Sequence, residues 1–177
     1  MTGIIKKTGI QLGIALGVAL VLLSSYIYFI ATKLFTNVWM GLFTIFITVI
    51  FGIIAILITK KKLGGYITFK EAFSTYFFTI VVGKLISCVF AVIISSFVLT
   101  TETRATIKQQ MSDFNMKIMK QNETPAEEIA KNNETFKTYD PFAPSEIIAP
   151  TIKYLLRDSL IGFLVALIFR NKRSLTV

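Results

Sequence analysis

The stretch KKKLGGYITFKEAF, residues 60–73, separates two of the longest apolar runs in this chain of 177 residues. Three lysines open the stretch, and the adjacent Gly64 and Gly65 favour a tight turn. Thr68 and Glu71 have the spacing of a capping box at the start of a helix. We therefore interpret the stretch as a short charged connection between two helices rather than as a site with its own chemistry.

The apolar runs predict a membrane protein. Hydrophobic residues make up 54% of the chain, charged residues make up 16%, and the mean hydropathy is +0.67, unlike a soluble domain. We expect one all-α membrane domain over residues 1–177, because helices satisfy their own backbone groups in lipid and no alternating strands are visible. Four segments are long enough to be transmembrane helices, namely residues 8–31, 36–59, 72–100 and 151–169.

The first apolar run follows Lys6 and Lys7, which is also how a secretory signal peptide begins. The run is longer than the apolar part of a usual signal peptide, and no convincing pair of small residues marks a cleavage site. We therefore expect it to remain in the protein as a transmembrane helix.

The distribution of basic residues predicts the orientation. Nine basic residues and the single acid Glu71 flank the segments on one side, whereas the long polar segment 101–150 has six basic and eight acidic residues. By the positive-inside rule, both termini are cytoplasmic and segment 101–150 is extracytoplasmic. The strongest topology anchors are Lys60, Lys61, Lys62, Arg170, Lys172 and Arg173.

The composition also argues against several kinds of function. The chain has no histidine and a single cysteine, Cys88, which excludes an intramolecular disulfide, a zinc cluster and imidazole catalysis. We expect no cofactor, no metal and no catalytic residue, and hence no enzyme. Nearly all of the net charge of +9 is expected on the cytoplasmic side, against the anionic headgroups of the lipid bilayer. No basic folded module of the kind that binds nucleic acid accompanies it.

Small residues recur at intervals of three or four in the first two segments, a spacing that lets helix backbones approach closely in lipid. The two stripes contain Gly9, Gly13 and Gly17 in the first segment and Gly41, Thr48 and Gly52 in the second. We predict that the stripes face each other in a hairpin. The alternatives are a homodimer through the first stripe, and chance, because glycine is common in membrane helices.

Two charged residues lie deep inside predicted transmembrane segments. Lys84 comes eleven residues after Phe73, and Asp158 comes eleven residues before Phe169, so on antiparallel helices both lie about 16 Å from the same boundary. A lone charge at this depth costs about 2.5–3.5 kcal/mol. We therefore predict a Lys84–Asp158 ion pair, which either docks the two helices or serves as an ion relay or polar binding site. Arg157 is expected to reach away, toward the outer surface.

The polar segment 101–150 is predicted to form a helical hairpin. Its first helix continues the third transmembrane helix to about Gln121, because apolar residues follow a helical spacing at Ile107, Met111, Phe114 and Ile118. Thr124 and Pro125 are typical of the start of a second helix, which runs to about Phe136. We expect these apolar positions to pack on each other, on a second copy of the chain, or on an extracytoplasmic partner.

The order of these features resembles a known family. A short inner loop, the motif YITFKEAFSTYF at residues 66–77, a polar outer segment and a final short helix are similar to the domain-of-unknown-function family 4199. These are small four-helix membrane proteins of Bacteroidetes-type bacteria. The resemblance implies a multi-pass protein of the bacterial inner membrane, and it implies no activity.

Two functional hypotheses follow from the residues and the resemblance. The first is a non-enzymatic envelope scaffold or accessory subunit whose outer hairpin contacts a partner. The alternative is a small transporter or channel that works as a homo-oligomer around Lys84 and Asp158.

Overall fold

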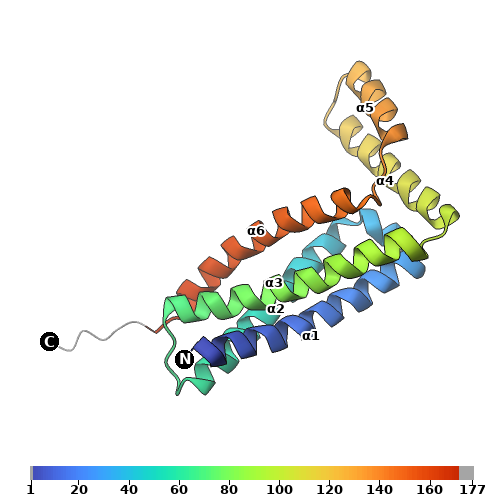
Figure 1. Cartoon of the computed structure of the whole chain (residues 1–177). Coiled ribbons are helices and arrows are strands. Elements are labelled where there is room, and N and C mark those ends of the chain that lie inside the picture. The colour runs from blue at the N-terminus through green and yellow to red at the C-terminus, as the bar shows by residue number, and fades with distance from the viewer. Residues whose placement is uncertain (1, 172–177) are drawn as a thin grey trace.

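The computed structural model describes residues 2–171, in which all regular secondary structure is helical (Figure 1). The predicted all-α fold is confirmed. The elements in chain order are α1 (Thr2–Phe29), the 3₁₀-helix η1 (Thr32–Thr36), α2 (Val38–Lys62), α3 (Phe69–Ile93), the π-helix η2 (Ile94–Val98), α4 (Thr101–Gln121), α5 (Ala126–Thr138) and α6 (Pro144–Phe169). The four longest helices, α1, α2, α3 and α6, form a bundle, and the shorter α4 and α5 form an arm that projects from one end of it (Figure 1).

Three helices in the described part of the chain are long and apolar enough to cross a membrane. They span Gly3–Phe29, Val38–Lys62 and Phe69–Val98, within a few residues of the first three predicted segments. The fourth predicted segment lies in α6, which is not among these three. Lys153, Arg157 and Asp158 fall in that segment and lower its hydropathy.

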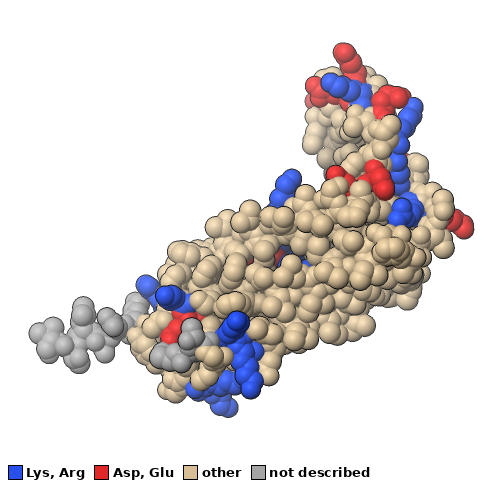
Figure 2. All heavy atoms as spheres, viewed as in Figure 1, with Lys and Arg blue, Asp and Glu red and all other residues tan. Residues whose placement is uncertain are grey.

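Charged side chains gather at the two ends of the molecule, with a mostly uncharged band between them (Figure 2). One end, called here the lysine end, has Lys60, Lys61 and Lys62 at the end of α2 and Arg170 after α6. The other, called the hairpin end, carries the arm, where both signs of charge mix (Figure 2). The predicted anchors Lys172 and Arg173 lie outside the described residues. An uncharged band between charged ends is the surface expected of a bundle in lipid.

The connection between α2 and α3 folds as predicted from its sequence. Gly64 and Gly65 have φ angles of +76° and +91°, a region that residues with side chains rarely adopt. The Thr68 hydroxyl accepts a hydrogen bond from the Glu71 N–H at 3.3 Å. In return, the Glu71 carboxylate accepts one from the Thr68 N–H at 2.9 Å. The capping box therefore starts α3.

The glycine stripe of α1 packs against α3, so the predicted pairing of the α1 and α2 stripes is wrong. Gly9 lies against Phe78, Gly13 against Val82 and Gly17 against Ile86, while Leu16 of α1 lies against Gly83. A Cβ atom on Gly13 would lie 2.6 Å from the Cβ of Val82, closer than such atoms approach. The stripe is thus occupied by α3, which also leaves no room there for the alternative homodimer contact.

Tyr76 of α3 fills the space between α2 and α6, a role that no spacing in the sequence predicted. Its side chain is fully buried, and a Cβ atom on either Gly52 or Gly162 would overlap its ring. Gly52 of the predicted α2 stripe therefore packs on α3. Thr48 is also buried, but Gly41 is exposed and has open space in front of it. The α2 stripe is close-packed toward the lysine end and open toward the hairpin end.

The third helix does not continue to Gln121 as predicted. It ends in the π-helical turn η2, after which Leu99 is extended, with φ −65° and ψ 125°. The Thr100 hydroxyl then accepts a hydrogen bond from the backbone N–H three residues later and starts α4 as a separate helix. α5 begins at Ala126, one residue later than predicted, and ends at Thr138. The break lets the arm turn away from the bundle (Figure 1).

Candidate functional site

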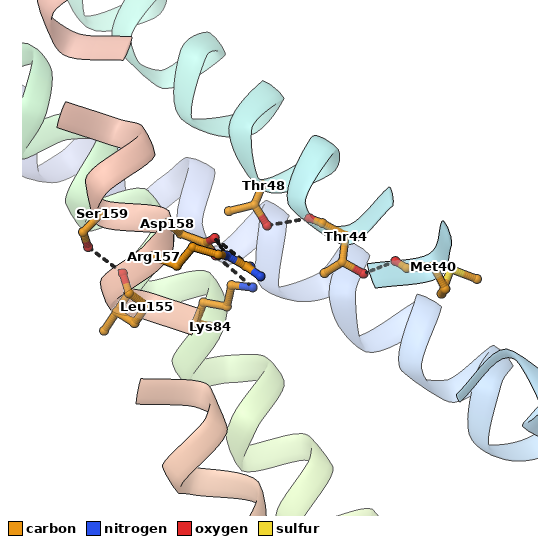
Figure 3. Close-up of polar contacts among 8 residues, drawn as sticks. All are labelled: Met40, Thr44, Thr48, Lys84, Leu155, Arg157, Asp158 and Ser159. Carbon is orange, nitrogen blue, oxygen red and sulfur yellow. Dashed lines mark hydrogen bonds and ion pairs between the residues drawn. The ribbon is translucent and has the colours of Figure 1, made fainter. Parts of the chain in front are cut away.

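Lys84 of α3 and Asp158 of α6 meet inside the bundle (Figure 3). Lys84 Nζ lies 3.2 Å from Asp158 Oδ2, and the two side chains are 10% and 1% exposed. Lys84 lies eight residues after Tyr76 on α3, and Asp158 lies four residues before Gly162 on α6. Residues at this spacing lie on one face of a helix, so both charges belong to the faces that pack together. The two residues paired in the sequence analysis are therefore in contact.

Arg157 joins this pair, so the expectation that it points away is wrong. Its Nη2 lies 2.8 Å from Asp158 Oδ1, and its Nε donates a hydrogen bond to the same oxygen at 2.9 Å. The guanidinium also lies over the Tyr154 ring, 5.0 Å from its centroid. Neighbouring helix positions point about 100° apart, but the long arginine side chain folds back along α6 to the carboxylate.

These three residues, called here the charged cluster, combine two cations with one carboxylate and have a formal net charge of +1. Asp158 Oδ2 has no hydrogen-bond partner among residues 2–171, so its contact with Lys84 is an ion pair without hydrogen-bond geometry. The buried Tyr76 hydroxyl also has no partner in the described part of the chain. Residues 2–171 contain no group of three possible metal ligands. The cluster has the chemistry to hold a charged or polar group.

A crevice of about 370 Å³ lies toward the hairpin end of the bundle. It is formed by residues of α1, η1 and α2 together with Tyr154 of α6. Gly41 and Thr44 line its α2 wall, and a Cβ atom on Gly41 would meet open space. Tyr154 is shared by the two features, because it lines the crevice and its ring also carries the Arg157 guanidinium, whereas the three cluster residues are not part of the crevice lining. Thr48 is one turn beyond Thr44 and is fully buried (Figure 3).

The base of the arm is fixed to the bundle. Ile107 of α4 and Phe142 are buried together with Tyr28 and Ile94 at the hairpin end. The Arg104 guanidinium lies 5.3 Å from the centroid of the Phe142 ring and donates a hydrogen bond to a carbonyl of η2. The predicted apolar stripe of α4 is therefore buried only at its first position.

A second, larger cavity of about 610 Å³ separates the arm from η1 and the start of α2, and is called here the groove. Its apolar lining comes from Phe35, Val38, Met111, Phe114, Phe136 and Tyr139. Asparagine and threonine side chains complete the lining, and no charged residue takes part. The Tyr139 hydroxyl donates a hydrogen bond to Glu146 at 2.9 Å. Partial burial and this bond raise the pKa of Tyr139 above its usual value, so the hydroxyl stays a donor.

A family model matches residues 11–171, nearly the whole chain. The chain belongs to the family described as Protein of unknown function (DUF4199). The resemblance inferred from residues 66–77 is confirmed. The DUF4199 match covers the charged cluster, the crevice, the arm and all of the bundle except the part of α1 before residue 11. No curated protein and no solved structure matches the chain.

Proposed function

We propose that this DUF4199 protein is a four-span, non-enzymatic accessory subunit or scaffold of the bacterial inner membrane, with cytoplasmic termini. Its arm docks a segment of an extracytoplasmic protein partner. The observation that carries the proposal is the groove, an uncharged, aromatic-lined cavity that opens beside an otherwise charged arm. A second copy of the chain is the other occupant that the groove would admit.

The packing of α6 supports its role as the fourth span. Its 26 residues extend about 39 Å, longer than a hydrocarbon core of about 30 Å. Asp158 pairs with both Lys84 and Arg157, so the cost of placing these charges in lipid is reduced. The end of α6 is held at the lysine end, where the Ile67 N–H donates a hydrogen bond to Asn171 Oδ1 at 2.9 Å.

The lining of the groove supports protein docking. Aromatic and methionine side chains are enriched at the buried centres of protein interfaces, whereas charged side chains are depleted there. A cavity bounded by two helices and a short turn suits the apolar face of an amphipathic helix, whose anchors repeat every three or four residues. The charges on the outer surface of the arm would then form the rim of the interface.

Site-specific photocrosslinking in cells tests the docking proposal. A crosslinker replaces Phe136, inside the groove, and in a matched control it replaces Ile118, which is on the same arm but outside the groove. We expect one partner crosslink from Phe136, lost when Phe114→Glu is added, and little crosslinking from Ile118. Equal crosslinking from both positions, or none from Phe136, contradicts docking in the groove.

A reporter fused near Asn122 tests the orientation separately. The proposed topology places this loop between α4 and α5 outside the cytoplasm. Activity of a periplasm-dependent reporter is the expected result, and a cytosolic signal contradicts the orientation.

The charged cluster favours a second candidate function, a small oligomeric transporter or channel. Ionisable residues inside transmembrane segments commonly mark ion or substrate pathways. Flux of a charged solute into liposomes that contain the protein, abolished by Lys84→Met and retained in Lys153→Met, supports this function. Liposomes without flux contradict it.

A further inference from the structure

We propose that the charged cluster binds a small, singly charged oxyanion, a carboxylate or a phosphate diester, at its partly exposed Arg157 beside Tyr154. This inference is independent of the arm and its partner. It deepens the second candidate function by naming the class of ligand, but a bound oxyanion need not be transported.

The charge balance is the first argument. Lys84 and Arg157 share one carboxylate, that of Asp158, which leaves a formal charge of +1 between α3 and α6. An uncompensated charge in the hydrocarbon region is energetically unfavourable. A single negative charge would neutralise the cluster, whereas a cation or a dianion would leave it charged.

The available hydrogen-bond donors are the second argument. A guanidinium has five N–H groups, and Arg157 directs only its Nε and Nη2 toward Asp158. Its side chain is 39% exposed, so Arg157 is the most accessible member of the cluster. Lys84 has three N–H groups and contacts Asp158 Oδ2 without hydrogen-bond geometry. Two oxygen atoms that share one charge match the planar fork of arginine, and this favours an oxyanion over a halide.

The route of access is the third argument. The crevice of about 370 Å³ is far larger than the roughly 30 Å³ that one water molecule takes up in the liquid. Tyr154 forms part of its wall, and the Arg157 guanidinium lies on the same ring. Gly41 has open space in front of it on the α2 wall of the crevice. Dissolved carboxylates and the phosphate groups of outer-leaflet lipids are both possible sources of the oxyanion.

The rival explanation is a purely structural ion pair, and Asp158→Asn separates the two. If the cluster only docks α3 on α6, removing the carboxylate weakens the protein and has no effect on anions. If the cluster is an oxyanion site, the same change raises its positive charge and lowers the anion concentration needed for half-saturation.

The experiment measures the unfolding midpoint of the full chain in a neutral detergent. Sodium acetate is exchanged at constant ionic strength for sodium chloride, whose single-atom anion lacks the paired oxygen atoms of a carboxylate. In a second arm, phosphatidylglycerol or zwitterionic phosphatidylcholine is added to the micelles. We expect a saturable rise of the midpoint with acetate, with phosphatidylglycerol, or with both.

The variants assign that effect to the cluster. Arg157→Gln is expected to raise the half-saturating concentration about tenfold or more, because a hydrogen bond to a charged group is lost. Lys153→Gln, an exposed cation on the same helix, is the matched control and is expected to leave it unchanged.

A response to acetate identifies a dissolved oxyanion, and a response to phosphatidylglycerol alone identifies a lipid headgroup. A wild-type protein with no saturable response to either, or a response that Arg157→Gln leaves intact, overturns the proposal. These outcomes need neither Lys84 nor Asp158 variants to fold. Oxyanion binding without flux in liposomes supports the proposed binding site and contradicts only the transporter function.

Discussion

The two halves of the bundle use the same kinds of residues in opposite ways. Toward the lysine end, Gly52 and Gly162 hold the Tyr76 ring between α2 and α6 with no spare space. Toward the hairpin end, Gly41 continues the same α2 stripe but lines a crevice that Tyr154 borders on the side of α6. A small residue therefore marks a place where close approach is allowed, and the neighbouring helix determines whether that space is filled or left open.

Enlarging these glycines gives the largest expected effect. Gly162→Leu forces side-chain atoms into the Tyr76 ring, and overpacking of this kind costs about 1–3 kcal/mol or more. We expect loss of the protein from membranes, or a much lower unfolding midpoint in detergent. Gly41→Leu is the matched control and is expected to be tolerated, because its Cβ would meet open space. Equal damage from both substitutions would refute the contrast between the two halves.

Breaking the charged cluster is expected to have the next largest effect. Lys84→Asp places two carboxylates together in a buried position, where loss of a partner costs about 3–5 kcal/mol. The charge swap with Asp158→Lys should restore accumulation only in part, because the new lysine would adjoin Arg157. Adding Arg157→Gln to the swap should restore more of it. If the triple variant accumulates no better than Lys84→Asp alone, direct pairing is wrong.

The base of the arm is expected to respond more weakly than the bundle. Arg104→Ala removes the cation that contacts Phe142 and a carbonyl of η2, and a hydrogen bond from a charged group is worth about 1.5–3 kcal/mol. Hydrogen exchange should speed up in α4 while the protection of α3 stays unchanged. Lys117→Ala, an exposed position on the same helix, is the control. Faster exchange throughout the bundle would mean that the arm and the bundle unfold as one unit.

Removing the cap of α4 is expected to have the smallest effect. Thr100→Ala deletes the hydroxyl that accepts the hydrogen bond from the Thr103 N–H at 3.2 Å, and such losses cost about 1 kcal/mol. Exchange should increase only in the first turn of α4. Thr106→Ala, inside the same helix and exposed, serves as the control. No change at the first turn would argue against a separate start of α4 at this position.

Sequence spacing predicted the features that depend on one helix or one turn. The capping box at Thr68 and Glu71 and the turn at Gly64 and Gly65 are local, so their residue types suffice to predict them. The Lys84–Asp158 contact joins two helices, but helical rise alone matches their depth. Nothing local in η2 indicated the break before α4, where a π-turn ends the helix without glycine or proline.

The choice of neighbours among helices depended on the tertiary structure. A stripe of small residues predicts close approach but does not name the helix that approaches, and bulky residues of α3 fill the α1 stripe as well as a second stripe would. Likewise, the position of Arg157 on α6 gives only the direction of its Cα–Cβ bond. Its long side chain can reach several directions from there, and the structure shows that it folds onto Asp158.

The amino-acid sequence by itself determined an all-helical chain with three strongly apolar helices, a glycine turn with a capped helix after it, and membership of DUF4199. Only the tertiary structure decided that α3 lies at the centre of the bundle, that Tyr76 closes one half of it, and that a crevice beside Tyr154 opens the other. The physical reason is that periodicity and hydropathy act within one segment, whereas packing depends on the shapes of two surfaces that the chain brings together.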